Sequence, residues 1–258
     1  MQRRAFLASV IASAIVLTAA EPAPAAPARQ AFSVDAEVAL HAYQAVVEEH
    51  MSDILRAIRV LARTADARGA NWTSIKPSLD SLAQDLSTDA ATWFALPDGS
   101  YFTTDGGRQP GNLADRPYFP TLMAGRDVVG SLVIGRSTGR RSIIVATPVL
   151  RDGRVVGAIG VSLRARLLSQ LVTDRAKIPD NMTFYALDRT GQTAIHKDPE
   201  LMFQFPSDIG DASLKSAVAV ILSHPSGTTR YRFRGVDKTA LFDRSDLTGW
   251  HFVLVKVK

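Results

Sequence analysis

The chain has 258 residues, of which 46% are hydrophobic and 21% charged, and its formal net charge is +5 at pH 7. This is ordinary globular composition with room for two modest domains. Lys and Arg are scattered rather than clustered, which argues against a nucleic-acid-binding protein. The sequence has no cysteine, which excludes disulfides, thiolate catalysis and cysteine-ligated zinc.

Residues 1–28 predict an export signal. Arg3 and Arg4 precede an uncharged stretch, 5–20, and two small-x-small cleavage sites follow, Ala23-Pro24-Ala25 and Ala26-Pro27-Ala28. The arginine pair is compatible with either the general secretory (Sec) route or the twin-arginine (Tat) route. The uncharged stretch is slightly short for a spanning helix, so an uncleaved membrane anchor is a third alternative. We therefore expect a periplasmic protein.

The segment 29–90 is predicted to be mainly helical. Between residues 34 and 68, apolar side chains recur at three- and four-residue steps, which indicates one long amphipathic helix that ends near Gly69. The stripe comprises Leu40, Tyr43, Val47, Met51, Ile54, Ile58 and Leu61. At 1.5 Å per residue the helix would be roughly 50 Å long, so it either runs beside two modules or packs on a twin helix in a homodimer. A second helix is expected after Pro77.

The segment 91–176 predicts an antiparallel sheet of about five strands. Residues 92–103 alternate around Pro97-Asp98-Gly99, and the β-branched runs 143–150 and 155–163 flank Asp152-Gly153, a strong hairpin signal. A short helix, 115–124, is predicted between them, with a side-chain cap at Asp115 and a stop at Gly125. A helix packed on such a hairpin would enclose a pocket.

The segment 177–258 repeats this pattern in shortened form. A linker helix, 165–172, leads to a boundary at 177–180. A hairpin then covers 182–194, a helix covers 212–223, and the strands are 228–233, 238–242 and 250–257. The predicted fold class is α+β: a long N-terminal helix followed by two similar modules, each an antiparallel sheet flanked by helices.

Signals of catalysis or metal binding are weak. The five histidines are dispersed, without the paired spacing of a zinc site, so neither a metal nor a cofactor is expected. The sequence Gly160-Val161-Ser162 lacks the second glycine of a nucleophile elbow. No catalytic residue is assigned, and an enzyme is not expected.

Several short motifs occur together in a distinctive order. They are Asp115-Arg116-Pro117-Tyr118-Phe119, Ala146-Thr147-Pro148-Val149, the turn Asp152-Gly153, residues 156–161, residues 185–191 and a closing Gly249-Trp250. From about residue 34 to the end, the chain resembles the double Cache (PAS-like) extracytoplasmic sensor family. The segment 112–119 and the turn 135–141 are also similar to sensor modules of C4-dicarboxylate kinases.

The resemblance implies that the module at 91–176 is membrane-distal and holds a small ligand. In amino-acid-binding members an arginine is followed by aromatics two and three residues later, a pattern that Arg116, Tyr118 and Phe119 match. The aspartate expected five residues after Gly157 is Ser162, which cannot neutralise an ammonium group. Arginine offers a planar fork to a carboxylate, so a small organic acid is the expected ligand.

Three hydroxyl residues are further ligand-binding predictions: Ser142, Thr147 and Ser162. Ser142 and Thr147 have opposite parity in one strand, so at most one of them faces the pocket. Thr147 is the more informative of the two because it interrupts an apolar run. The turn arginines Arg136, Arg140 and Arg141 are expected either to be solvated or to form a lid that attracts anions.

The predicted function is a periplasmic small-molecule sensor without its own output domain. Its partner would be a membrane histidine kinase, chemoreceptor or transporter. Two alternatives remain open at this point: a solute-binding protein that delivers its ligand to a transporter, and a ligand-free structural module whose pocket is filled by its own side chains.

Overall fold

The computed structural model describes residues 35–86, 90–135, 139–179 and 181–257. The predicted export signal and Arg136 lie outside these residues. None of the helices within the described ranges has the length and apolar content that a membrane span requires.

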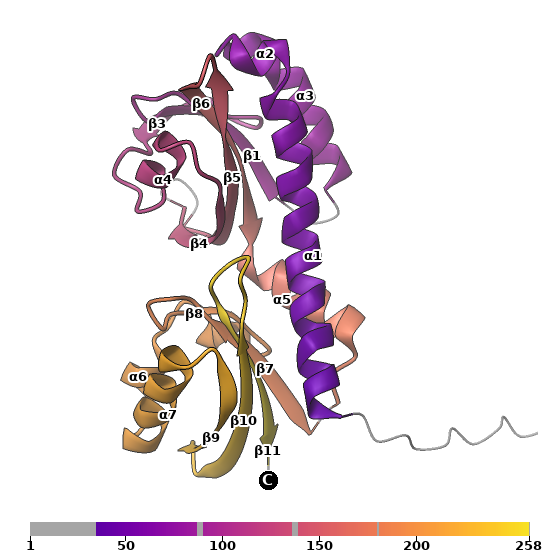
Figure 1. Ribbon diagram of the computed structural model, residues 1–258, viewed down its shortest axis with the longest axis vertical. Helices are drawn as coiled ribbons and strands as arrows, with labels where there is room; N and C mark the ends of the chain where they lie inside the picture. Colours follow the sequence, from indigo (N-terminus) through magenta and orange to yellow (C-terminus); the bar gives the residue numbers. More distant parts are fainter. Residues whose placement is uncertain (1–34, 87–89, 136–138, 180, 258) are drawn as a thin grey trace, which may run out of the picture. The chain divides into compact units, whose positions relative to one another are not determined.

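Three helices precede the first sheet (Figure 1): α1 (Ala36–Ala62), α2 (Ala65–Arg68) and α3 (Trp72–Asp85). Helix α1 begins after Asp35, whose carboxylate accepts a hydrogen bond from the Glu37 N–H at 2.7 Å. The predicted single helix to Gly69 is interrupted, because the Thr64 hydroxyl caps a new turn by accepting from the Ala67 N–H. Helix α3 starts five residues before Pro77, not after it as predicted.

The first sheet has six strands in the order β3-β2-β1-β6-β5-β4. The strands are β1 (Ala90–Ala95), β2 (Ser100–Thr103), β3 (Gly107–Asn112), β4 (Val128–Ile134), β5 (Arg141–Arg151) and β6 (Arg154–Arg164). The predicted hairpin around Asp152-Gly153 is confirmed: both residues adopt positive φ, 50° and 75°, as a tight primed turn requires. Strand β3 was not anticipated, since its sequence Gly-Arg-Gln-Pro-Gly-Asn lacks strand-forming residues.

The short helix of this sheet differs from the prediction. Helix α4 (Phe119–Met123) begins four residues after Asp115 and has no side-chain cap. Gly125, at φ +75°, lies just beyond its end, as predicted. Residues 115–118 form turns instead, so Arg116 precedes the helix.

The second sheet has five strands in the order β8-β7-β11-β10-β9. Its elements are β7 (Met182–Leu187), β8 (Thr193–His196), η1 (Pro199–Leu201), α6 (Pro206–Ile209), α7 (Ala212–Ser223), β9 (Ser226–Phe233), β10 (Val236–Arg244) and β11 (His251–Val257). Helix α5 (Ala165–Ala176) connects the sheets. If β3 is set aside, both sheets have the same order, second-first-fifth-fourth-third, which confirms the predicted repeat of architecture.

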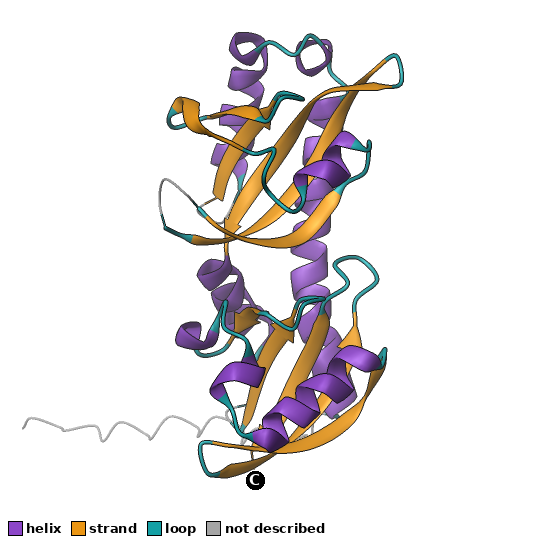
Figure 2. Cartoon of the chain, turned by 90° about the vertical axis from the view of Figure 1, so that its left-hand side faces the viewer, coloured by secondary structure: helices purple, strands orange, loops and turns teal. Residues whose placement is uncertain are grey.

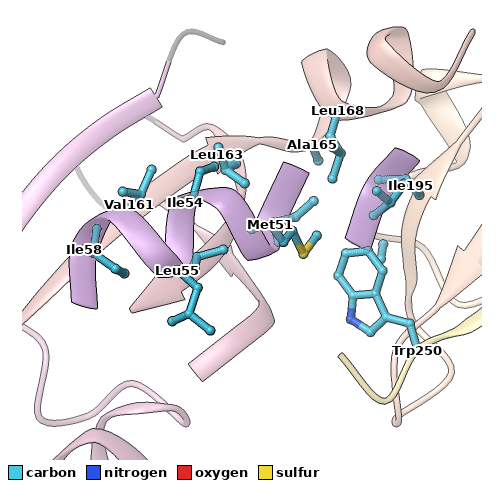
Figure 3. Packing of buried hydrophobic residues seen from close by; sticks show 14 of the residues in the cluster. Met51, Ile54, Leu55, Ile58, Val161, Leu163, Ala165, Leu168, Ile195 and Trp250 are labelled. Atoms are coloured by element: carbon cyan, nitrogen blue, oxygen red, sulfur yellow. The ribbon is translucent and has the colours of Figure 1, made fainter. Parts of the chain in front are cut away.

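Each sheet is covered by helices on both faces, fully on one and in part on the other. One face packs on α1: Figure 3 shows Ile54 beside Val161 and Leu163, which share one side of β6. Tyr43 of α1 meets Phe184 and Phe252 of the second sheet, at 5.0 and 5.2 Å between ring centroids. The predicted stripe is thus buried within the chain, apart from a half-buried Leu61, so α1 serves as the spine of two sheets.

The opposite faces carry the short helices, which lie in front of the strands in Figure 2. Helix α4 covers part of the first sheet, and α7 packs on β9 and its neighbours in the second. Because side chains alternate along a strand, one residue in two points to this face. These half-covered faces are where the cavities lie.

Candidate functional site

A cavity of about 330 Å³ opens on the α4 side of the first sheet. Its lining residues come from β1 to β6, from the turns that precede α4 and follow β2, and from Gly135 and Arg140 between β4 and β5. The polar and aromatic members are Trp93, Tyr101, Thr103, Asp105, Gln109, Arg116, Tyr118, Arg140, Ser142, Ser162 and Arg164. Four of the six residues predicted from the sequence are therefore brought together here: Arg116, Tyr118, Ser142 and Ser162.

Three arginines make the cavity cationic. Arg116, Arg140 and Arg164 line it together with a single carboxylate among the described residues, Asp105, which is exposed. Arg116 is half-buried, and its Nη2 donates to the Ile134 carbonyl oxygen at 3.1 Å. A guanidinium has five N–H donors, so this bond holds the side chain at the cavity and leaves other donors for a ligand.

The aromatic wall is built on β1. Trp93 is 4% exposed, and its ring centroid lies 6.3 Å from that of Tyr118, which is 6% exposed. The indole lies over Gly160 of β6, where a Cβ would overlap the ring atoms. The glycine in the motif 156–161 is therefore required by the close approach of Trp93.

Two hydroxyls complete the polar lining. The Trp93 indole N–H donates to Ser162 Oγ at 3.2 Å, which leaves the hydroxyl proton of Ser162 available as a donor. Ser142, on the adjacent strand β5, is 8% exposed and lines the same cavity. Both groups can donate to an anion.

Two predicted residues lie elsewhere. Thr147 has the opposite parity to Ser142 and faces α1 and α2, where it lines a different pocket with Arg59 and Arg63. The preference for Thr147 over Ser142 was therefore wrong about which side chain faces the cavity. Phe119 is 4% exposed and packs with Leu122 and Ile144 in the apolar cluster under α4, so Tyr118 is the cavity residue of the pair.

Several lining residues were missed from the sequence. Arg164 has the parity of Ser162 in β6, so the two-residue period could have identified it. Asp105 and Gln109 belong to the turn and strand after β2, a segment without strand-forming residues. Gln109 is held there by its Nε2, which donates to Thr103 Oγ1 at 3.0 Å.

Known proteins share this architecture. The family model described as Cache domain (dCache) matches residues 28–257. The ligand-binding domain of the Pseudomonas aeruginosa chemoreceptor PctB, in complex with L-Arg, has a TM-score of 0.69 and 16% identity, over 86% of this chain and 92% of that one. The Pseudomonas fluorescens CtaA domain with L-isoleucine has a TM-score of 0.65 and 15% identity, over 86% and 89%.

The sensory domain of the Campylobacter jejuni chemoreceptor Tlp3 with isoleucine bound has a TM-score of 0.62 and 14% identity, over 85% of this chain and 89% of that one. No curated protein matches the chain. At these identities the solved structures establish the fold, whereas the family model covers nearly all of the sequence. The chain belongs to the Cache domain family, whose members are extracytoplasmic sensory domains that bind small ligands and are not enzymes.

Proposed function

We propose that this chain is a sensor that binds a small organic acid, or a related polar metabolite, in the cavity of the β1–β6 sheet. The observation that carries the proposal is the meeting of three arginines and two serine hydroxyls around one cavity with a single exposed carboxylate. Such a donor-rich, positively charged lining favours an acceptor-rich anion.

Arg116 is the central ligand contact in this proposal. Its guanidinium is already positioned by the Ile134 carbonyl, so little side-chain entropy remains to be lost when a carboxylate binds. Tyr118 and Trp93 would enclose the apolar part of the ligand. Ser142 and Ser162 would satisfy the remaining carboxylate lone pairs.

The proposed ligand class differs from α-amino acids in one group. The solved structures in the comparison contain isoleucine, L-isoleucine and L-Arg, each of which has a carboxylate and an ammonium. Here the β6 residue that lines the cavity beside Trp93 is Ser162, and a hydroxyl provides no charge for an ammonium. Asp105 is the remaining acidic lining residue, and its exposure weakens its attraction for a cation.

Binding would be communicated through β6 and α1. Ser162 points into the cavity, whereas its neighbours Val161 and Leu163 pack against α1 on the other face. A ligand that moves β6 therefore changes how the long helix α1 packs against the sheet. We propose that the 91–176 module is membrane-distal and that α1 transmits the change to a membrane partner, a histidine kinase, a chemoreceptor or a transporter.

Isothermal titration calorimetry with matched ligand pairs tests the proposal. The pairs are isoleucine with 3-methylpentanoate and arginine with 5-guanidinopentanoate, which differ only in the α-amino group, together with succinate and malate. We expect saturable binding of at least one acid without an α-amino group. Arg116→Ala should weaken it about 10- to 100-fold, since a hydrogen bond to a charged group contributes roughly 1.5–3 kcal/mol.

Arg154→Ala is the matched control, because Arg154 is exposed at the start of β6 and does not line the cavity. Its titration should superimpose on that of the wild type. Undiminished binding by Arg116→Ala would remove Arg116 from the site. Binding of the amino acids alone would overturn the organic-acid class, and no binding by any probe would favour a ligand-free module.

A further inference from the structure

A second cavity, of about 350 Å³, lies in the β7–β11 sheet, on the face that carries α6 and α7. Its polar lining residues are Thr183, Tyr185, Thr193, His196, Asp198, Tyr231, Arg234 and Lys238. Its position follows from the repeat: β7, β8 and β10 occupy the same places in the sheet order as β1, β2 and β5 of the first cavity. The fold thus forms one such cavity in each sheet, and different side chains line the two cavities.

Two cations line this second cavity. Arg234 Cζ and Lys238 Nζ lie 5.2 and 5.4 Å from the centroid of the Phe233 ring. Among the ion pairs between described residues, none involves either side chain. Partial burial lowers the pKa of Lys238, and repulsion by Arg234 adds to the effect. An anion between the two cations would relieve this repulsion.

His196 is a further hydrogen-bond donor of defined tautomer. The Asp198 backbone N–H donates to His196 Nδ1 at 2.7 Å, so Nδ1 is an acceptor and the proton of the neutral ring is on Nε2. Burial lowers the pKa of His196 to about 4, against the opposing effect of Asp198, so the ring is neutral near pH 7. The Asp198 carboxylate itself accepts from the Glu200 N–H at 3.1 Å.

A poorly paired tyrosine hydroxyl belongs to this lining. Tyr185 is 5% exposed, and its buried hydroxyl is a neighbour of the Tyr231 hydroxyl but makes no hydrogen bond of normal geometry to any described residue. Its ring stacks on that of His196 at 5.8 Å between centroids. A buried polar group without a partner destabilises the folded chain, so a ligand that pairs with it would gain affinity.

The rest of the lining is apolar. Leu201, Pro206, Ile209, Leu214 and Val236 contribute to it, and Ile209 and Val236 are 42% and 38% exposed. Exposed aliphatic side chains beside a hollow favour an occupant with a hydrocarbon body. The cationic groups and the poorly paired hydroxyl require that the same occupant carry an acceptor.

We propose that the β7–β11 cavity is a second ligand site, which binds a monocarboxylate with an apolar body through Lys238, Arg234, Tyr185 and the Nε2–H of His196. The hydrocarbon part lies against the aliphatic rim. This site is independent of Arg116 and of the cavity in the first sheet.

Calorimetry on the full chain tests this site with benzoate, phenylacetate and 4-methylpentanoate, each compared with its alcohol: benzyl alcohol, 2-phenylethanol and 4-methylpentanol. At least one carboxylate should bind saturably and at least tenfold more tightly than its alcohol. Lys238→Met should weaken that binding at least tenfold, and Tyr185→Phe should weaken it less. Lys256→Met is the control, because Lys256 is exposed on the adjacent strand β11 and does not line the cavity.

Arg116→Ala separates the two sites. Unchanged binding of the carboxylate by this variant supports the second site, whereas its loss assigns the carboxylate to the first cavity and overturns the proposal. Equal binding of the alcohols, or no binding of any of the three carboxylates, also overturns it.

A wild-type measurement covers the case in which Lys238→Met does not fold. The ¹³Cε1–¹Hε1 NMR signal of His196, assigned with His196→Gln, should shift progressively as the carboxylate is added. A signal that stays in place at saturating carboxylate contradicts the proposal.

Discussion

Single residues decide whether each cavity exists and what it attracts. In the first sheet, Gly160 lets the Trp93 indole lie flat on β6, and the indole N–H then sets the hydrogen-bond role of Ser162. In the second, one backbone N–H fixes the tautomer of His196. The chemistry of both cavities therefore depends on contacts between residues that are close in space and, in the first case, distant in sequence.

His196 should make stability depend on pH. Its pKa is lowered by burial to about 4 in the folded chain, compared with an ordinary value of 6.5. The unfolded chain therefore binds a proton that the folded chain does not between these values, so stability is fully present above pH 6.5 and falls as the pH drops towards 4. The difference amounts to about 3 kcal/mol, at 1.36 kcal/mol per pKa unit.

Urea unfolding between pH 4 and 7 measures this effect. His196→Gln should reduce the pH dependence across that window, whereas His41→Gln, at an exposed position on α1, should leave it unchanged. Equal slopes for wild type and His196→Gln would show that the imidazole is solvated in the folded chain.

At the scale of elements, α1 is held by its buried stripe rather than by its caps. Ile54 is 1% exposed, and Figure 3 shows it beside Val161 and Leu163 of β6. Val60, on the same helix, is 66% exposed. Ile54 and Val60 are both β-branched and have similar, modest helix propensities. They differ in burial.

Ile54→Ala should lower the free energy of unfolding by about 2–5 kcal/mol, because it leaves a cavity between α1 and β6. Val60→Ala should change it by less than about 0.5 kcal/mol. Chemical denaturation of the two variants gives both values. A loss for Ile54→Ala no larger than that for Val60→Ala would contradict the packing of α1 on β6.

At the scale of the whole molecule, one hydrophobic cluster includes residues of α1, α5 and both sheets. A buried hydrogen bond joins the sheets as well: the Trp250 indole N–H donates to the Gly130 carbonyl oxygen at 3.0 Å. Gly130, at φ +87°, lies where the register of β4 shifts, and this bulge turns its carbonyl out of the ladder. Trp250 is 1% exposed.

Trp250→Phe should reduce stability by about 1–3 kcal/mol, since it leaves the Gly130 carbonyl buried without its donor. Unfolding should stay a single transition, because the α1 cluster still connects the sheets. Thermal unfolding followed by circular dichroism measures both. Trp72→Phe is the control, because Trp72 is half-buried and stacks on Phe102. Separate unfolding transitions for the two sheets in Trp250→Phe would contradict the shared core.

The sequence by itself determined the elements whose signals are local. The apolar period of α1, the positive-φ turn at Asp152-Gly153 and the repeated order of hairpin, helix and strands depend on neighbours within a few residues. Through the positions that the family's motifs mark, it also predicted two residues that line the first cavity, Arg116 and Ser162. Two predicted helix boundaries were wrong, because Thr64 and the turns at 115–118 compete with the helix through local hydrogen bonds.

Only the tertiary structure decided which faces are hollow and what lines them. Ser142 rather than Thr147 enters the first cavity because α1 covers the odd face of β5, a fact of packing between segments about 90 residues apart. Strand β3 forms because β2 supplies its hydrogen-bond partners, against its own propensity. The second cavity was missed entirely, because Tyr185, His196 and Lys238 carry no shared motif and meet only when the four strands β8, β7, β11 and β10 pair.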